Sequence, residues 1–263
     1  MRVRRNPAQR PGLREARVAL ALGWLRIAVV AAEIIALIGN FRYVLGFSSF
    51  GVANFFGYFT IQSAIIAVGV TLVGGIVLLS GRTESVVLLT ARTILLVYVV
   101  LSGIVFGLLA AFSSTRTYQI AIPWSDQLLH FILPTVLLAD WLVDRYLGPR
   151  APAVPWLALA WAVPFPVIWL VFTLVRGDSV GWYPYFFLDP SQVSGPPVIT
   201  AYCAGILAVI LGFVAALIGV SRTRMLHPTE RPSSPAGNPE PRADLPATEA
   251  HETRAGRASV EQL

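Results

Sequence analysis

The sequence predicts an all-α, polytopic membrane protein with six transmembrane helices, and three observations lead to this prediction. Hydrophobic residues make up 56% of the 263 residues, charged residues only 13%, and the mean hydropathy is +0.68, whereas soluble domains carry about 25% charged residues. Six stretches reach the roughly 20 apolar residues that a helix needs to cross a bilayer. Beyond residue 220 the composition changes to Pro, Glu, Arg, Ala, Thr and Ser, which predicts a disordered tail.

We expect the six spans at about residues 17–39, 53–79, 85–112, 125–147, 153–175 and 196–220. The first follows a basic stretch, but it is too long for the hydrophobic part of a signal peptide and is broken by Arg26 and Glu33. The fourth should bend at Pro134, which lacks an N–H, and the fifth is interrupted at "VPFP" (163–166). The predicted organisation is a basic segment at 1–16, a six-helix domain at 17–220 and a tail at 221–263.

The Arg residues predict the orientation. The chain contains no Lys, which indicates the codon bias of a GC-rich bacterial genome and excludes Lys-based catalysis. With the N-terminus inside, the inner segments hold eleven Arg near the helix ends and the outer segments three, as the positive-inside rule requires. Both termini are therefore expected in the cytoplasm, and the protein in the plasma membrane, which in a bacterium is the inner membrane. The basic N-terminal segment favours anionic lipid rather than nucleic acid.

Several ionisable side chains fall inside the predicted spans, where each costs about 2.5–3.5 kcal/mol to insert. Arg26, Arg92 and Asp140 are expected to share one level in the inner half of the bundle. With Glu33, they predict a structural ion-pair network that locks spans one, three and four together. A polar transport path through the same residues is the alternative.

Two further polar residues, Thr60 and His130, fall in the outer half. By helix rise, Thr60 lies about 10 Å and His130 about 8–9 Å below the outer ends of their spans. Thr60 could simply bond back to the Phe56 carbonyl, and His130 could simply bridge helices. Because a Thr hydroxyl needs a base to become a nucleophile, and His is suited to that role near neutral pH, the pair predicts nucleophilic catalysis.

Residues near this pair could support such chemistry. Asp126 precedes His130 by one helical turn and could orient its ring. Three residues around Thr60 could donate hydrogen bonds or stabilise an oxyanion: Asn54, Gln62 and Ser63.

The loop "GWYPYFFLDPSQVSGPP" (181–197) is rich in aromatic residues and turn formers. It predicts either an aromatic belt at the membrane interface or an outer lid over a pocket, formed by Trp182, Tyr183, Tyr185 and Asp189. No metal site or other cofactor is expected, because Cys203 is the only cysteine and His130 the only histidine within the spans.

Five motifs resemble those of the androgen-induced-gene-one-like integral membrane proteins, in their bacterial branch. They are "NFFGYFTIQS" (54–63), "DQLLHFILP" (126–134), "ADW" (139–141), "RG" (176–177) and "GWYPYFFLDP" (181–190), and the resemblance covers about residues 17–220. Animal members are intramembrane threonine hydrolases that cleave fatty-acid esters of hydroxy fatty acids. The resemblance implies Thr60 as the nucleophile and His130 as the second catalytic residue. The aromatic loop and the positions of Asp126 and Asp140 follow the bacterial branch, so the animal substrate is not carried over.

These observations together predict an intramembrane hydrolase of a fatty-acyl lipid ester, with membrane lipids and the ester as its partners. A small transporter or channel is one alternative, although the sequence has no inverted repeat. A non-enzymatic scaffold, whose tail recruits other proteins, is another.

Overall fold

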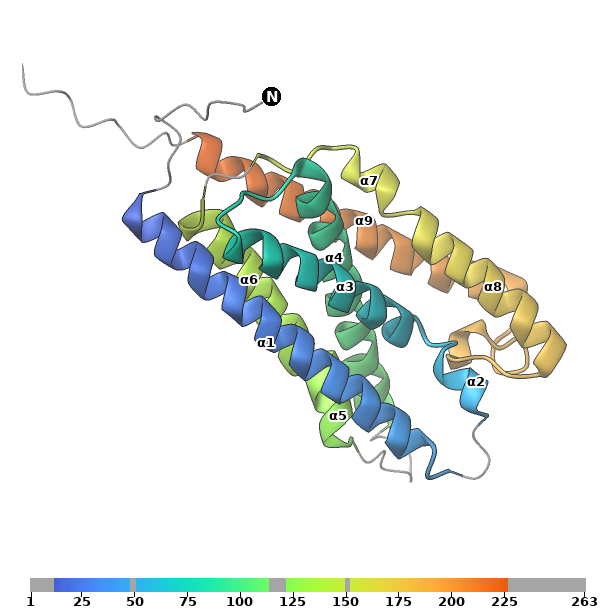
Figure 1. Cartoon of the computed structure of the whole chain (residues 1–263). Coiled ribbons are helices and arrows are strands. Elements are labelled where there is room, and N and C mark those ends of the chain that lie inside the picture. The colour runs from blue at the N-terminus through green and yellow to red at the C-terminus, as the bar shows by residue number, and fades with distance from the viewer. Residues whose placement is uncertain (1–11, 48–50, 114–121, 150–151, 227–263) are drawn as a thin grey trace, which may run out of the picture. The chain divides into compact units, whose positions relative to one another are not determined.

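The structure is a computed structural model that describes residues 12–47, 51–113, 122–149 and 152–226, and within these ranges it contains helices and no β-strand. The longer helices are α1 (Leu13–Val44), α3 (Phe59–Leu79), α4 (Val86–Ser113), α6 (Leu133–Leu147), α8 (Pro164–Val180) and α9 (Pro196–Leu226). The shorter ones are α2 (Val52–Phe55), α5 (Trp124–Gln127), the π-helix η2 (Leu128–Ile132), α7 (Ala158–Trp161) and the 3₁₀ helix η3 (Phe186–Leu188) (Figure 1). Most of the predicted basic segment and the tail from residue 227 lie outside the described residues.

Six helical stretches are long and apolar enough to cross a membrane, which confirms the predicted six-helix, all-α architecture. They are Leu13–Val44, Phe59–Leu79, Val86–Ala111, Trp124–Leu147, Ala158–Val180 and Pro196–Thr223. The fifth lies five residues later than predicted, because the segment before it is tied to the end of α9. There, Ser221 Oγ accepts the Val154 N–H at 3.1 Å and Arg222 donates to the Val154 carbonyl at 3.0 Å.

The backbones of α1 and α3 approach each other closely. A Cβ added to Gly75 would lie 3.2 Å from the Gly23 carbonyl oxygen, and one added to Gly23 would meet Leu79. Small residues at helix contacts permit such packing in membranes, where there is no hydrophobic driving force between helices.

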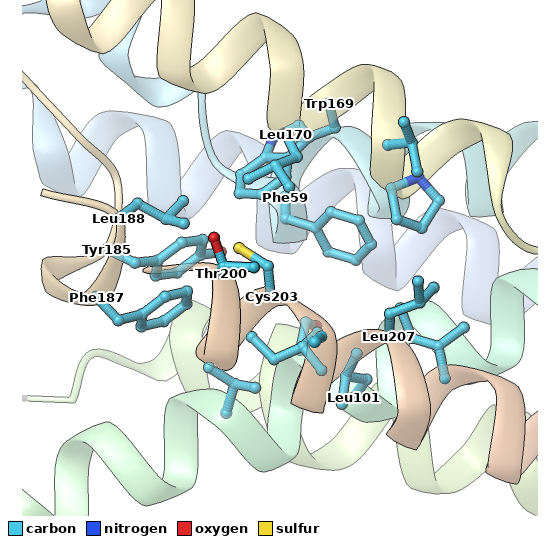
Figure 2. Close-up of a pocket in the computed structure, with 17 residues that line it drawn as sticks. Phe59, Leu101, Trp169, Leu170, Tyr185, Phe187, Leu188, Thr200, Cys203 and Leu207 are labelled. Atoms are coloured by element: carbon cyan, nitrogen blue, oxygen red, sulfur yellow. The ribbon is translucent and has the colours of Figure 1, made fainter. Parts of the chain in front are cut away.

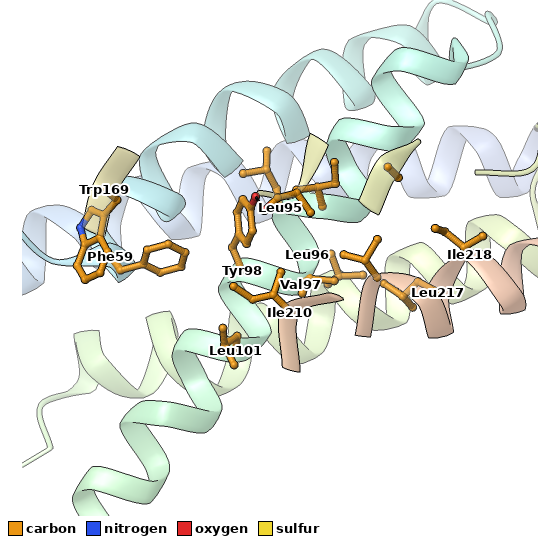
Figure 3. Packing of buried hydrophobic residues seen from close by; sticks show 14 of the residues in the cluster. Phe59, Leu95, Leu96, Val97, Tyr98, Leu101, Trp169, Ile210, Leu217 and Ile218 are labelled. Atoms are coloured by element: carbon orange, nitrogen blue, oxygen red, sulfur yellow. Dashed lines mark hydrogen bonds between the residues drawn. The ribbon is translucent and has the colours of Figure 1, made fainter. Parts of the chain in front are cut away.

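Three hydrophobic clusters lie among the described residues, and the smallest joins α1 and α3 through Leu22 and Leu78; the two larger ones fill the bundle. One joins α4, α8, α9 and the loop after α8 through residues such as Tyr98, Trp169 and Ile210 (Figure 3). The other joins α1, α3 and the start of the fourth span through Ile61 and Leu129. In the first cluster, Tyr98 donates to the Ala162 carbonyl at 2.8 Å. This carbonyl lies in the break between α7 and α8, at the point where "VPFP" predicted an interruption.

Helix α4 runs antiparallel to both α3 and α6. Near its start, Arg92 contacts Asp140, which lies in the second half of the fourth span, and lies beside Gly74 late in α3. Near its end, the Phe106 ring stacks on His130, early in the fourth span, with ring centroids 3.9 Å apart. It follows that α3 and α6 run in the same direction, with Thr60 and His130 near the same end of the bundle.

Candidate functional site

Thr60 lies in the first turn of α3, whereas the sequence analysis had placed it about 10 Å along one continuous helix. The predicted helix over 53–79 is two helices, because α2 ends at Phe55 and α3 begins at Phe59. The break is held by two bonds: the Gly57 N–H donates to the Asn54 carbonyl at 3.0 Å, and Trp169 Nε1 donates to the Gly57 carbonyl at 3.0 Å. The hydroxyl therefore sits at the start of a helix, where backbone N–H groups lack helical partners.

The side chain of Thr60 is buried, and its neighbour is Tyr185 from the loop between α8 and α9. Burial raises the pKa of Tyr185 to about 12, while hydrogen-bonding interactions with Thr60 and with the backbone of Phe59 and Thr60 act in the opposite direction. These interactions place the Tyr185 hydroxyl at the N-terminal end of α3. The alternative bond from Thr60 to the Phe56 carbonyl is not found among the described residues, and that carbonyl accepts a hydrogen bond from Gln62 Nε2 at 2.8 Å.

An apolar cavity of about 240 Å³ lies next to Thr60, between α4, α8, α9 and the same loop. Tyr185 and Phe59, the residue before Thr60, both form part of its wall. The cavity is slightly smaller than the roughly 300–1,000 Å³ of pockets for drug-sized ligands. Its lining consists of Phe59, Leu101, Ser102, Val105, Pro166, Val167, Trp169, Leu170, Tyr185, Phe187, Leu188, Thr200, Cys203, Ala204, Ile206, Leu207 and Ile210 (Figure 2). A lining of this kind suits a narrow hydrocarbon chain.

His130 lies in the π-helix η2, and single π turns inside helices often occur at functional sites. Its Nδ1 is 3.0 Å from the Asp126 backbone carbonyl. A carbonyl only accepts, so Nδ1 carries the hydrogen and Nε2 of the neutral ring keeps its lone pair. Phe106 stacks on the ring, and Gly103 lies directly against the His130 carbonyl. The imidazole is thus fixed in the orientation and tautomer of a base.

The sequence analysis expected Asp126 to orient this histidine as the carboxylate of a triad does. In the structure Asp126 contacts the ring through its backbone carbonyl instead. The carboxylate Oδ1 is 3.8 Å from His130 Nδ1, which is beyond hydrogen-bond distance, and it accepts a short hydrogen bond from Asn40 Nδ2. Asn40 is a buried residue of α1 that the sequence analysis did not single out. The sequence did hold a sign that Asn40 faces inward. It follows Glu33 by seven residues and Arg26 by fourteen, and these spacings put all three on one face of the helix.

Thr60 and His130 occupy similar levels of the bundle but have different neighbours. Thr71 of α3 and Asp140 of α6 line the same small cavity. Because α3 and α6 run in the same direction, counting back to Thr60 and to His130 gives rises of about 16 and 15 Å. In the part of the chain that the structure describes, no hydrogen bond or ion pair joins Thr60 to His130.

Each of the three polar residues around Thr60 has a hydrogen-bond partner other than the Thr60 hydroxyl. Asn54 Oδ1 accepts from Arg176 Nη2 at 2.6 Å, which connects α2 to α8. Gln62 caps the Phe56 carbonyl, and Ser63 Oγ donates to the Thr60 carbonyl at 3.1 Å. Their bonds stabilise the break between α2 and α3, and the structure turns neither Asn54 nor Gln62 toward the Thr60 hydroxyl.

The four residues of the predicted outer lid make separate sets of contacts, and they do not form one cover over the cavity. Trp182 packs on Tyr58, with ring centroids 5.6 Å apart, and lies under Arg176 at 5.4 Å. Tyr183 packs against Gly177 of α8. Asp189 closes a local turn by accepting hydrogen bonds from Ser191 and Gln192, which holds the pKa of its carboxyl below the usual value. Only Tyr185, among the four, lines the cavity.

A buried ion-pair network lies toward the opposite end of the bundle, and it brings Arg26, Arg92 and Asp140 together. Arg26 Nε is 3.0 Å from both carboxylate oxygens of Asp140, and Arg92 Nη2 also contacts Asp140. Both guanidinium groups also reach Glu84, at 2.8 and 2.6 Å, and Asp144, at 2.6 and 3.0 Å. Two cations thus face three carboxylates, which favours a structural lock between α1, α4 and α6.

The sequence analysis missed two members of this network and wrongly included one residue. Glu84 lies before the predicted third span and was treated as part of a loop. Asp144 lies four residues after Asp140, a spacing that marks one helix face. Glu33 is buried, but within the described residues it forms no part of the network, and its Oε2 has no hydrogen-bond partner. It lies two helical turns, about 10 Å, from Arg26, which is too far for a shared contact.

Among the described residues, no group of three or more His, Cys, Asp or Glu side chains is placed to hold a metal ion. No protein-family model, curated protein or solved structure matches this chain.

Proposed function

We propose that this protein is an intramembrane hydrolase of a fatty-acyl lipid ester, with Thr60 as the nucleophile and His130 as the base. The observation that carries the proposal is the position of the apolar cavity, because its wall contains Tyr185 and also Phe59, the residue directly before Thr60. A candidate nucleophile thus lies beside a space suited to an acyl chain. The motif resemblance to the androgen-induced-gene-one-like proteins points to the same residue.

The chemistry follows the usual course of nucleophilic catalysis. His130 Nε2 takes the Thr60 proton, and the Thr60 oxygen forms a bond to the ester carbonyl carbon. When the tetrahedral intermediate collapses, the ester C–O bond breaks and the imidazolium returns the proton to the leaving alcohol. Water, activated in turn by His130, then cleaves the acyl-Thr60 ester and releases the fatty acid.

Proton transfer requires His130 Nε2 to come within about 2.6–3.2 Å of the Thr60 hydroxyl, and such bonds are often longer in unliganded proteins. The two helices that carry these residues both depart from regular α-helix nearby. The α2–α3 break lies directly before Thr60, and the π turn contains His130. The mechanism needs the two side chains to approach each other, and these two places are where the helices can rotate to allow it.

We place the end of the bundle that holds the buried ion-pair network at the cytoplasmic face of the plasma membrane. Both termini then lie in the cytoplasm, and the end that holds Thr60 faces outward. The positive-inside distribution of Arg supports this orientation. A reporter fused after residue 226 tests it: activity of a cytoplasm-specific reporter is expected, and activity of a reporter that works only outside would reverse the orientation.

The activity is tested with purified protein in lipid nanodiscs and methylumbelliferyl palmitate as substrate. Thr60→Ala is expected to reduce turnover to background, Thr60→Ser to retain part of it, and His130→Ala to lower kcat by about 10²–10⁴-fold. Thr135→Ala is the matched control, because the Thr135 hydroxyl is exposed and bonds back to the Phe131 carbonyl at 2.7 Å. Wild-type turnover by Thr60→Ala would rule out the mechanism, as would an equal loss in Thr135→Ala.

Covalent chemistry gives a second readout. Rapid acid quenching during turnover should trap a palmitoyl group on the peptide that contains Thr60, and this adduct should be absent in Thr60→Ala. An acyl group found on Cys203 instead would identify a different nucleophile, since that thiol also lines the cavity.

A further inference from the structure

Tyr185 stands between the apolar cavity and Thr60. Its side chain is part of the cavity wall, and its hydroxyl lies near the Thr60 side chain and the first backbone groups of α3. An acyl chain in the cavity that brings its carbonyl carbon toward Thr60 passes the Tyr185 side chain, which lines the cavity at this point. The same phenol is therefore the group that the carbonyl meets first.

The ring of Tyr185 is held by other aromatic rings rather than by its hydroxyl alone. It stacks on Phe187, with centroids 5.3 Å apart and an angle of 4° between the planes. Trp169 of α8 and Tyr58 lie at 6.0 and 5.9 Å. Figure 2 shows Tyr185 and Phe187 side by side at one end of the cavity. The hydroxyl can therefore exchange one partner for another while the ring keeps most of its contacts.

The loop that carries Tyr185 has a glycine at each end with a backbone that other residues rarely adopt. Gly181 ends α8 with φ of 65°, and Gly195 precedes α9 with φ of 88°. Between them, Leu188 is fully buried, and Trp182 is fixed by Arg176 and Tyr58. The loop is thus anchored at several points, which favours a small movement of the Tyr185 side chain over an opening of the whole loop.

We infer that Tyr185 is a substrate-contacting residue of this site: its hydroxyl lies near Thr60 when the cavity is empty, and it donates its O–H to the ester carbonyl oxygen when an acyl chain fills the cavity. The inference rests on the hydrolase function proposed above. Substrate binding then does two things at once. The Thr60 hydroxyl is released toward His130, and the carbonyl gains a donor that strengthens its bond as negative charge develops on the oxygen.

The phenol is suited to this role because it stays protonated at neutral pH, and a protonated phenol is a donor. It also lies in apolar surroundings, where a hydrogen bond to developing charge is stronger than in water. Loss of one such donor lowers kcat by about 10²–10³-fold in enzymes that stabilise an oxyanion.

The test uses Tyr185→Phe, which removes the oxygen and keeps the ring, with Tyr183→Phe as the matched control from the same loop. Tyr185→Phe is expected to lower kcat by about a hundredfold with KM changed less than about threefold, and Tyr183→Phe to behave as wild type. Binding of a fluorescent fatty acid should be unchanged in both. Wild-type kcat in Tyr185→Phe would overturn the inference, and so would a loss of fatty-acid binding that matches the loss of turnover, because that result means a structural role.

A readout without turnover separates this inference from the proposed activity. Fluorotyrosine is introduced at position 185 or 183, and the protein is saturated with a long-chain methyl ketone, which offers a carbonyl without a leaving group. The fluorine NMR signal at 185 should shift and the one at 183 should not. A shift at 185 in a protein without hydrolase activity would refute the activity alone, whereas an unchanged signal at 185 with bound ketone would refute the role of Tyr185.

Discussion

Replacing Arg26 by Met should destabilise the folded protein more than any other single change in the ion-pair network. The Arg26 side chain is fully buried and contacts three carboxylates, those of Glu84, Asp140 and Asp144. Its removal leaves Arg92 alone against all three and adds a second uncompensated buried negative charge. Breaking a buried ion pair by removing one partner costs about 3–5 kcal/mol.

Asp144→Asn provides the internal comparison, because it removes a negative charge from a network that has one in excess. Asparagine keeps an acceptor oxygen for the hydrogen bonds from Arg26 and Arg92, so these bonds lose their charge assistance but not their partner, and the change relieves repulsion among the carboxylates. Its cost should therefore be clearly smaller than that of Arg26→Met. The double variant Arg26→Met/Asp140→Leu should recover part of the loss, since it replaces a charge pair by apolar side chains.

Thermal unfolding in detergent, followed by tryptophan fluorescence, measures these differences. Trp141 is a suitable reporter, because it is buried on α6 beside the network and donates to Thr93 Oγ1 at 3.0 Å. At about 2–4 °C per kcal/mol, Arg26→Met should lower Tm by about 6–20 °C. Arg82→Met, at an exposed position of the α3–α4 loop, is the control and should leave Tm nearly unchanged. Equal melting of Arg26→Met and Arg82→Met, or a larger loss in Asp144→Asn, would refute the charge argument.

Two other predictions concern the candidate site. Gly103→Ala should destabilise the protein by about 1–3 kcal/mol and weaken activity, because the new Cβ would overlap the His130 carbonyl oxygen, a backbone atom; Gly69→Ala, where a Cβ meets nothing within 4 Å, should not lower Tm. If both variants melt alike, the close packing of α4 on His130 is wrong. The absorbance of wild type minus Tyr185→Phe should show a tyrosinate midpoint near pH 12, since burial raises the pKa of Tyr185 to about 12. The raised pKa means that this phenol stabilises the fold below pH of about 10 and loses that contribution as pH rises toward 12; a midpoint near 10 would show that the hydroxyl is solvated.

The fold class could be predicted from sequence because membrane spans are a local property. Each of the six stretches carries enough apolar residues in succession to require a helix, whatever it packs against. The interruption at "VPFP" and the distortion before Pro134 were also predictable, since proline removes a backbone donor at a known position. Arg26, Arg92 and Asp140 could be grouped by depth alone, because buried charges need partners and few were available.

The limits of sequence reasoning appear at the ends of helices and in loops. The aromatic composition of this stretch did not show that the helix breaks between Phe55 and Phe59, because aromatic residues occur both in helices and in turns. The turn is stabilised by the bonds of Gly57 to Asn54 and Trp169, and Trp169 is distant in the chain. Glu84 and Tyr185 both lie outside the predicted spans, and both point back into the bundle. No periodic pattern marks such residues, because their direction depends on loop conformation.

The sequence by itself thus determined that the described part of this protein has six helices long and apolar enough to cross a membrane, and which polar residues had to face inward, because hydrophobic length and the cost of buried charge act residue by residue. Tertiary structure alone decided the partners of those residues. It paired Asn40 with Asp126, completed the ion-pair network with Glu84 and Asp144, and put Tyr185 rather than His130 beside Thr60. The physical reason is that each of these contacts joins segments far apart in the chain, so it depends on how the helices cross and the loops fold back.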